Sequence, residues 1–462
     1  MPDLPNSMHA RDRANILHPY TNAVNHQRNG PLIIDKGEGI YVFDDQGKRY
    51  IEGLAGLWSV AVGFGEERLV SAAARQMEKL PYYHTFASKS HEPSILLAEK
   101  LVSLSPQRLE KVFFTNSGSE ANDTVVKLLR YFNNVVGRPQ KKKIISRQRA
   151  YHGVTVASGS LTGLPLNHRD FDLPMPGVKH VSCPHHYRNG APGETEEEFA
   201  ARLAAEMEAV IVSEGPDTVA AFIGEPLMGA GGVIPPPAGY WQKIQEICRK
   251  YDVLIVADEV ITGFGRLGSM FGCDYYGIDP DIMVVSKQIT SSYQPLAAVL
   301  ISEELFAPIA ENTGRIGGFG HGFTGSGHPV ATAVALENIE IIEERGLVEN
   351  ARVVGKVLQA KLREFAGHPL VGEVRGVGLI AGVELVADKE SRTAFDASLG
   401  IGTYVFERAH EHGLIIRNSG DTIAFCPPLI IREDQIHDLI TRFSAALDDA
   451  MAYIRSNSTP RG

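Results

Sequence analysis

Cysteine is scarce in this chain and is never clustered. The four cysteines, Cys183, Cys248, Cys273 and Cys426, lie far apart, and no C-x-x-C pair occurs. A disulfide framework needs paired cysteines and a structural zinc site needs closely spaced thiolates, so we expect neither. This usage is typical of a protein in a reducing cytoplasm.

Long apolar runs are also missing. No run of about 18 apolar residues occurs, so we expect no helix that spans a membrane. The N-terminus, Met-Pro-Asp-Leu-Pro, lacks the basic-then-apolar order of a signal peptide. Both absences favour a cytoplasmic localisation and no membrane partner.

The chain has fewer positively charged than negatively charged residues. The 45 lysines and arginines face 55 aspartates and glutamates, which gives a formal net charge of −10 and argues against nucleic acid as a partner. Hydrophobic residues at 44% and charged residues at 22% describe an ordinary soluble globular protein. A length of 462 residues exceeds what one hydrophobic core usually serves, which favours more than one domain.

The pattern of apolar and polar residues changes twice along the chain. Residues 1–38 are polar and mixed, typical of a wrapping arm, and residues 39–53 alternate around Asp45-Gln46-Gly47 like a β-hairpin. From about residue 65 to 330, short Val/Ile-rich runs alternate with amphipathic helices, which predicts parallel strands buried on both faces. After residue 330 the pattern is α+β. We expect an α/β protein with a large domain over 65–330 and a C-terminal small domain over 331–462. The arm and hairpin over 1–64 are expected to pack with the small domain.

Residues 263–268 read Gly-Phe-Gly-Arg-Leu-Gly after the apolar run 253–258, which matches the dinucleotide-binding pattern G-x-G-x-x-G. That pattern requires a helix to follow the glycines. Here Gly268 leads into SMFGCDYYGIDPD, which has no helical period. An NAD-dependent oxidoreductase is therefore disfavoured, and we expect Asp258, at the end of the strand, to carry the chemistry.

The stretch TNSGSEAND, residues 115–123, lies where a strand gives way to an amphipathic helix. Ser117 and Glu120 have the spacing of a capping box, which is a purely structural role. The same stretch also suits a phosphate-binding cup, because Gly118 lets the backbone come close and the helix start offers free N–H groups. The two interpretations remain open at this point.

Three more residues have side chains that would suit the same ligand as this helix start. Lys287 ends the apolar run 282–287, where open parallel sheets bind ligands, and suits a Schiff-base lysine. Asp258 ends a neighbouring run and suits a protonated pyridine nitrogen. Tyr151 offers an aromatic face. An anion cup, a ring partner, an amine and a stacking face together indicate pyridoxal phosphate.

Two other stretches give weaker indications of a functional site. Cys183, His185 and His186 suggest a metal site, but no fourth ligand is in view, so we expect a polar loop and no metal. The glycine-rich run 314–329 lacks the G-K-[ST] ending of a P-loop.

Nearly the whole chain resembles the class III, fold-type I aminotransferases, and among them the ω-amino acid:pyruvate and (S)-selective amine transaminases. The motifs are HPYTN (18–22), GLAGLWSV (53–60), FFTNSGSEAND (113–123), YHG (151–153), GEPLMGAGGV (224–233), LIVADEVITGFGRLG (254–268), VVSK (284–287), HGFTGSGHP (321–329) and RNSGDTIAFCPPL (417–429). Their order and spacing agree with that family.

The resemblance assigns cofactor roles. It implies that Lys287 is the catalytic Schiff-base and proton-shuttling lysine and that Asp258 keeps the pyridine nitrogen protonated. The remaining implied cofactor-binding residues are Val260, Tyr151, Gly118, Ser119, Glu225 and, from the partner subunit of a homodimer, Thr324 and Phe323. Active sites at a dimer interface are implied as well, with dimer against tetramer left open.

The resemblance also implies the substrate-binding residues. Arg417, in an R-x-x-G-D pattern, would pair with the carboxylate of an amino or keto acid, which a guanidinium binds bidentately. The other implied pocket residues are Trp58, Phe86, Tyr151 and Ala230. Because indole and phenyl rings offer apolar surface and Ala230 leaves room, we expect bulky or hydrophobic amines as donors.

Two positions depart from many relatives, which carry Tyr where Gly325 stands and Gly where Gln288 follows the lysine. Both bear on substrate range rather than on reaction type. The expected function is a ping-pong transaminase that moves an amino group from an amine or ω-amino acid to an α-keto acid such as pyruvate. The alternatives are a class III transaminase dedicated to one ω-amino acid (GABA or ornithine), an aminomutase, and a binding protein that kept the fold without the chemistry.

Overall fold

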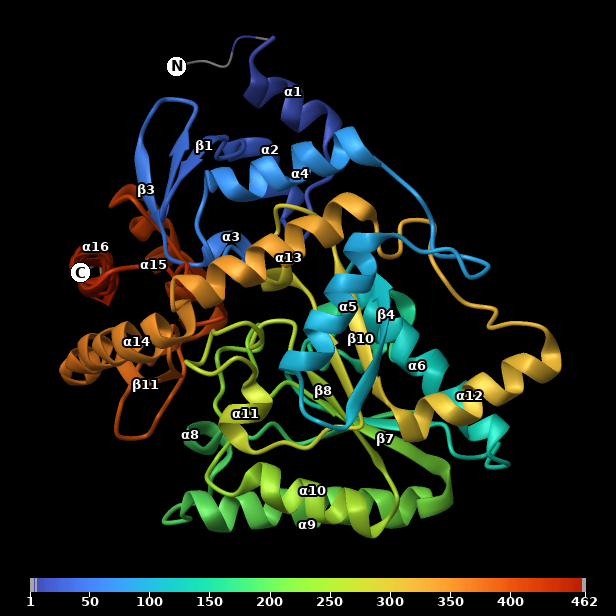
Figure 1. Ribbon diagram of the computed structural model, residues 1–462. Helices are drawn as coiled ribbons and strands as arrows, with labels where there is room; N and C mark the ends of the chain where they lie inside the picture. The colour runs from blue at the N-terminus through green and yellow to red at the C-terminus, as the bar shows by residue number, and fades with distance from the viewer. Residues whose placement is uncertain (1–3, 5, 459–462) are drawn as a thin grey trace.

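A seven-stranded sheet forms the centre of the molecule in the computed structural model, which describes residue 4 and residues 6–458 (Figure 1). Its strand order is β4-β10-β9-β8-β7-β5-β6. Neighbours from β9 to β6 are parallel, and β10 runs antiparallel between β9 and β4. The strands are β4 (Leu109–Thr115), β5 (Lys143–Arg147), β6 (Val178–Val181), β7 (Val219–Gly224), β8 (Leu254–Asp258), β9 (Ile282–Val285) and β10 (Ala297–Ser302).

The two faces of this sheet are both buried, as the uninterrupted apolar runs predict. In β8, Ile255 and Ala257 pack into one core cluster and Val256 packs into the other. Helices α9 (Glu196–Glu214) and α10 (Tyr240–Lys250) cover the first face, and α6 (Gly118–Val135) covers the second. The fold class expected from the sequence, α/β with a mostly parallel sheet, is confirmed.

Helices α4 (Glu67–Lys79) and α5 (Glu92–Leu104) both pack on α13 (Pro329–Glu344), which leads from the large sheet toward the C-terminal part (Figure 1). That part contains α14 (Leu347–Arg363), α15 (Ile401–Glu411), α16 (Glu433–Ser458) and a sheet of order β11-β12-β15-β14. Its strands are β11 (Val371–Val377), β12 (Ile380–Leu385), β14 (Arg417–Ser419) and β15 (Thr422–Phe425). The remaining α-helices of the described residues are α3 (Ala55–Trp58), α7 (Val156–Leu161), α8 (His186–Asn189), α11 (Gly272–Tyr276) and α12 (Glu303–Ile316), besides two in the arm.

The predicted hairpin is present as β2 (Tyr41–Asp44) and β3 (Arg49–Glu52), and β3 pairs in parallel with β13 (Leu414–Ile415) from the C-terminal part. The N-terminal segment thus shares a sheet with residues more than 350 positions away. The domain boundaries at residues 64 and 330 stay predictions.

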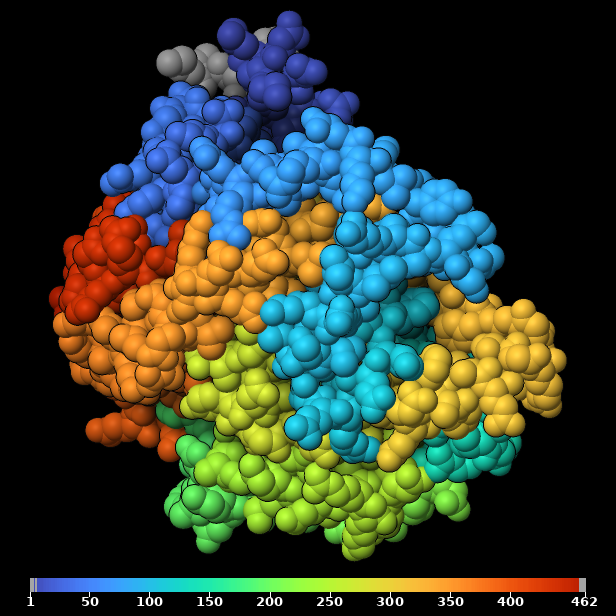
Figure 2. Space-filling model, in the orientation of Figure 1, coloured from blue at the N-terminus to red at the C-terminus, as the bar shows by residue number. Residues whose placement is uncertain are grey.

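The arm is more ordered than its composition suggests. It forms α1 (Met8–Asn15), α2 (Ala23–Asn29) and the edge strand β1 (Ile34–Glu38), and it lies at one end of the molecule (Figure 2). No residue of α1 or α2 is buried. Strand β1 is mostly exposed as well, in agreement with the expected arm rather than a core element, and its pairing with β2 supplies order that the sequence pattern does not signal.

The segment after Gly268 was expected to lack helix, and there the prediction was wrong. Helix α11 forms over Gly272–Tyr276 because its N-terminal N–H groups find acceptors from elsewhere in the chain. The Glu259 carboxylate accepts hydrogen bonds from the N–H groups of Gly272 (2.9 Å) and Cys273 (2.6 Å). The helix is only five residues long and begins after Gly268, so it is not the helix of a dinucleotide-binding loop.

No helix within residues 6–458 is long and apolar enough to cross a membrane. All four cysteines are buried and none is in a disulfide.

Candidate active site

The candidate active site is a cavity of about 270 Å³ at the carboxyl ends of β8 and β9, beside the first turn of α6. Ligands of open α/β sheets bind at such an edge. Six of the residues implied by the sequence line this one cavity: Gly118, Ser119, Tyr151, Asp258, Val260 and Lys287.

Asp258 is buried, with 3% of its surface exposed, and it remains ionised. Burial alone would raise the pKa of this carboxyl, but hydrogen bonds and the electrostatic effect of His152 lower it below its ordinary value. Its Oδ2 accepts from His152 Nδ1 at 2.7 Å and from Asn122 Nδ2 at 2.9 Å. Among the described residues, its Oδ1 accepts only from the N–H of Val260, at 3.1 Å, which leaves acceptor capacity next to the cavity.

Lys287 follows β9 in a left-handed backbone conformation, with φ of 48°, and its side chain borders the cavity. Burial lowers its pKa to about 8, although the carboxylates of Asp258 and Glu225 act in the opposite direction. A neutral, nucleophilic amine is therefore accessible near neutral pH.

The first turn of α6 fits both interpretations of residues 115–123. Ser117 Oγ accepts from Glu120 N at 3.2 Å, and Glu120 Oε2 accepts from Asn116 N at 2.8 Å, so the capping role is present. The same Ser117, together with Gly118 and Ser119, lines the cavity. A Cβ on Gly118 would lie 3.2 Å from Val260 Cγ2, so a side chain there would crowd the cavity wall.

These groups fit pyridoxal phosphate. A helix start with two serine hydroxyls suits the phosphate, the open Oδ1 of Asp258 suits a protonated ring nitrogen, and Lys287 suits the aldehyde. Two buried polar atoms beside Asp258, Asn122 Oδ1 and His152 Nε2, also lack a hydrogen-bond partner within the described part of the chain.

Tyr151 lines the cavity beside a residue that sequence reasoning did not assign. Burial raises the pKa of the Tyr151 phenol, and so does its hydrogen bond with Tyr20, which belongs to the N-terminal arm. The Tyr20 hydroxyl also accepts from Asn167 Nδ2 at 2.5 Å. Tyr20 lies in the HPYTN motif (18–22), but nothing in that motif indicates that its side chain reaches this wall.

Glu225 lies behind Tyr151 rather than on the cavity lining. Its carboxylate accepts from the N–H groups of Tyr151 (3.1 Å) and Gly229 (2.9 Å), and complete burial raises its pKa. Its implied contact with the cofactor hydroxyl stays a prediction.

Arg417 lies on β14, and its positive charge acts on Lys287 and Tyr151. Among the residues that the structure describes, no carboxylate pairs with its guanidinium. Trp58, 2% exposed, packs with apolar residues such as Ile261, and Ala230 is 8% exposed.

Phe86, Phe323 and Thr324 do not line the cavity of their own chain. Phe86 is 47% exposed and lies against Gly322, and the Tyr82 hydroxyl donates to the carbonyl of Thr324 at 2.9 Å. These residues therefore gather on the outer surface of the subunit.

The two unusual positions have different surroundings. Gln288 is fully buried, and its amide donates to the carbonyls of Ile261 (2.7 Å) and Gly263 (2.8 Å), away from the cavity. A Cβ on Gly325 would lie 2.7 Å from Asn116 Oδ1, so any side chain there would shift a residue of the cavity wall.

Comparison with known proteins finds aminotransferases among the relatives of this chain. The sequence profile of the family described as aminotransferase class III matches residues 22–447. A thermostable ω-transaminase variant engineered for asymmetric synthesis of enantiopure bulky amines is 61% identical, with a TM-score of 0.96 over 97% of this chain and 100% of the other. The ω-transaminase from Pseudomonas jessenii in complex with PMP is 60% identical, with a TM-score of 0.96 over 99% of this chain and 100% of the other.

A curated relative has a different substrate in its name. A probable γ-aminobutyrate transaminase 3, mitochondrial, from Oryza sativa subsp. indica is 49% identical over 433 residues, which are 94% of this chain and 85% of the relative.

Proposed function

Since the chain belongs to the class III aminotransferases and is a pyridoxal-phosphate-dependent transaminase, we propose that its amino donors are amines, including bulky ones, and ω-amino acids, with pyruvate as acceptor. The observation that carries this proposal is the combination of Lys287 with an unpaired Arg417 at the same site. The lysine serves every donor, whereas the guanidinium serves those substrates that have a carboxylate.

Pyridoxal phosphate, when bound, supplies an aldehyde carbon and an electron-accepting ring. Ser117, Ser119 and the N–H groups of the first turn of α6 would hold its phosphate. Asp258, kept ionised by His152 and Asn122, would hold a proton on the ring nitrogen, and Val260 and Tyr151 would contact the ring. Lys287 Nζ would take the proton from the substrate carbon that bears the amino group and pass it to the cofactor.

The residues proposed to bind the substrate form a charged part and an apolar part. Arg417 binds the carboxylate of pyruvate or of an ω-amino acid, and it turns away when an amine without carboxylate binds. Trp58 and Ala230 would give apolar surface for a bulky amine, and Phe86, which lies on the outer surface of its own subunit, would contribute to such a surface only in the proposed dimer.

We also propose a homodimer in the cytoplasm. Support for the dimer comes from the surface group of Phe86, Thr324 and Phe323, since an exposed aromatic surface beside a cavity suits a partner subunit. The four free cysteines suit a reducing compartment.

The testing experiment is an absorbance titration of the purified enzyme with an arylalkylamine and then with pyruvate. The visible band of the covalently held cofactor should disappear with the amine and return with pyruvate. A Lys287→Ala variant should lack that band, and the surface variant Lys361→Ala should keep it.

The relative named as a γ-aminobutyrate transaminase makes γ-aminobutyrate a second candidate donor. If the band responds to γ-aminobutyrate and not to the arylalkylamine, the enzyme remains a transaminase but the bulky-amine proposal is wrong.

A further inference from the structure

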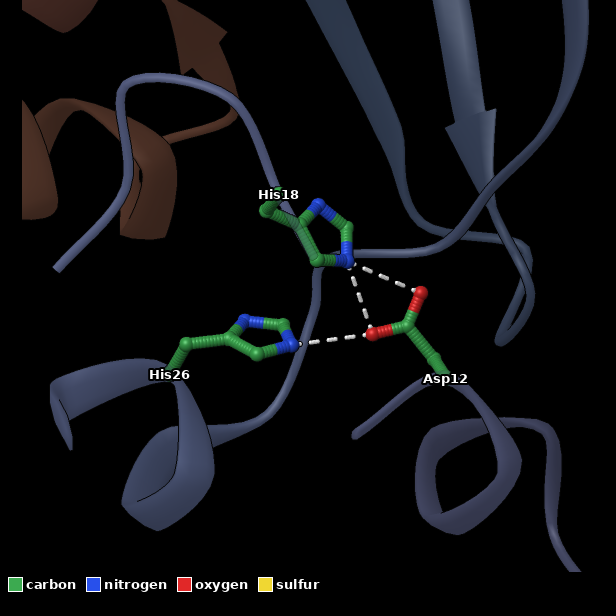
Figure 3. A group of neighbouring side chains, drawn as sticks. All are labelled: Asp12, His18 and His26. Atoms are coloured by element: carbon green, nitrogen blue, oxygen red, sulfur yellow. Dashed lines mark hydrogen bonds and ion pairs between the residues drawn. The ribbon is translucent and has the colours of Figure 1, made fainter. Parts of the chain in front are cut away.

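A second cluster of ionisable groups lies outside the active site, in the N-terminal arm. Asp12 on α1, His18 on the connecting segment and His26 on α2 point toward one another (Figure 3). The Asp12 Oδ1 lies 2.9 Å from His18 Nε2 and 2.9 Å from His26 Nε2, and Oδ2 lies 3.0 Å from His18 Nε2. We call these three residues the arm cluster.

We propose that the arm cluster binds a divalent transition-metal ion of the zinc type, with His18 Nε2, His26 Nε2 and a carboxylate oxygen of Asp12 as its protein ligands. Two imidazoles and one carboxylate are a ligand set that suits zinc and its first-row neighbours. This proposal revises the expectation, drawn from the sequence, that the protein has no metal site.

The geometry comes close to that of such a site. Tetrahedral ligand atoms about 2.05 Å from a zinc ion lie roughly 3.3 Å from each other. Asp12 Oδ1 lies 2.9 Å from both imidazole nitrogens, so small outward movements of these side chains would admit the ion. In Figure 3 the Nδ1 atoms of both rings point away from the carboxylate, so each can carry the ring proton while Nε2 binds the ion.

Charge and access fit as well. Within the part of the chain that the structure describes, no lysine or arginine pairs with Asp12, so its negative charge faces only the two imidazoles. The side chains of His18, Asp12 and His26 are 29%, 15% and 9% exposed, which leaves an entry path for an ion. A hollow of about 260 Å³, bordered by His18 and His26, has room for water molecules as the remaining ligands.

Among the described residues, a second group of suitable ligands differs in its charge. His185, Glu373 and Glu384 also come close together, but Arg375 Nη1 lies 2.6 Å from Glu373 and 2.7 Å from Glu384. The guanidinium already neutralises those carboxylates, so that cluster is an ion-pair network.

An ion in the arm cluster would close the segment from residue 12 to residue 26 into a loop. That loop contains Tyr20, whose hydroxyl bonds to Tyr151 in the wall of the active site. Metal binding therefore stabilises the arm in the position where it completes this wall.

The first test is calorimetric titration of the chelator-treated holoenzyme with zinc chloride. The unmodified protein should bind one ion per chain at this site, and His26→Gln should weaken that binding at least about tenfold. His437→Gln is the matched control, because His437 is an exposed histidine near a single carboxylate, Glu433, at 3.9 Å. Equal zinc affinity in the unmodified protein and in His26→Gln would overturn the proposal, as would no saturable binding up to about 1 mM zinc.

A second variant separates metal binding from simple hydrogen bonding. Asp12→Asn keeps an oxygen that accepts from both imidazoles but removes the charge that an ion needs. In chelator it should therefore keep the unfolding midpoint and the cofactor absorbance of the unmodified protein, while its zinc affinity falls at least about tenfold.

Hydrogen exchange gives a readout that does not depend on activity. Zinc should slow the exchange of residues 8–29 in the unmodified protein and not in Asp12→Asn. If zinc slows exchange equally in both proteins, the ion binds elsewhere and the proposal is wrong.

Discussion

Two buried carboxyl groups in this protein have opposite charge states. Asp258 and Glu52 are 3% and 5% exposed, yet the pKa of Asp258 is lowered, whereas burial raises the pKa of Glu52 to about 8. Burial is nearly the same in the two places, so the neighbours decide the charge.

The neighbours differ in kind. Asp258 accepts hydrogen bonds from His152 and Asn122 side chains and from one backbone N–H. Within the described part of the chain, Glu52 accepts only from the N–H groups of Leu54 and Gly56, in the turn that leads to Trp58. Backbone amides alone do not offset the desolvation of Glu52, so it stays protonated at neutral pH and shapes a turn, while Asp258 offers a charge to the cofactor.

The largest expected effect comes from neutralising each carboxyl in turn. Asp258→Asn should lower kcat/KM about 10³-fold, because the charge that holds a proton on the ring nitrogen is lost. Glu52→Gln should change kcat/KM by no more than about threefold, since that carboxyl is already neutral. Steady-state rates with an arylalkylamine and pyruvate test both, and similar losses in the two variants would break the comparison.

The pH dependence of the unfolding free energy should reveal the protonation state of Glu52. The folded-state pKa of about 8 lies above the unfolded value of 4.5, so the folded state keeps a proton that the unfolded state loses. The stabilisation that this proton gives the folded state is fully present below pH 4.5 and is lost as the pH rises to 8, by as much as about 5 kcal/mol.

Denaturant unfolding of the enzyme and of Glu52→Gln at pH 5, 6.5 and 8 measures this loss. The difference in unfolding free energy between the two proteins should change with pH in that window. A constant difference would mean that Glu52 is ionised in the fold.

Arg417 sharpens the comparison, because it is a cation near both Lys287 and Tyr151 that no carboxylate of the described chain takes as a partner. Arg417→Ala should raise KM for pyruvate about 30-fold, equivalent to about 2 kcal/mol of lost ion pairing. The kcat/KM for an arylalkylamine in the first half-reaction should stay within about threefold. The control is Arg432→Ala, an exposed arginine paired with Asp434, and equal losses for both substrates would assign Arg417 a structural role.

The smallest expected effect concerns His152. His152→Leu removes one hydrogen bond and its electrostatic support from Asp258, so the pKa of Asp258 rises. Activity depends on the carboxylate and is lost as the pH falls through that pKa, so the acid limb of the kcat/KM profile should move up by about one pH unit. An unchanged acid limb would show that Asn122 and Val260 suffice to keep Asp258 ionised.

Much of the fold was predictable from local pattern. The apolar runs at 219–226, 253–258 and 282–287 became β7, β8 and β9, because strands buried on both faces must be continuously apolar. The missed elements are polar or short. Strand β1 is the polar stretch IDKGE, which the pairing with β2 orders, and α11 depends on the Glu259 carboxylate.

The site was predictable in its components and not in its supports. Lys287 and Asp258 end neighbouring strands, so their meeting at one sheet edge follows from parallel topology. The roles of His152, Asn122 and Tyr20 could not be read from the sequence, because hydrogen-bond partners separated by more than 100 residues leave no local pattern.

The sequence by itself determined the parallel sheet, the amine and carboxylate at its edge, the phosphate-binding helix start, and with them the kind of cofactor. These depend on apolar periodicity and on residue types at strand and helix ends, which are local properties. The tertiary structure alone decided that Asp258 is charged while Glu52 is neutral, that Tyr20 joins the active-site wall, and that Asp12, His18 and His26 converge. Charge state and ligand geometry depend on which groups lie within a few ångströms, and only the folded chain fixes those distances.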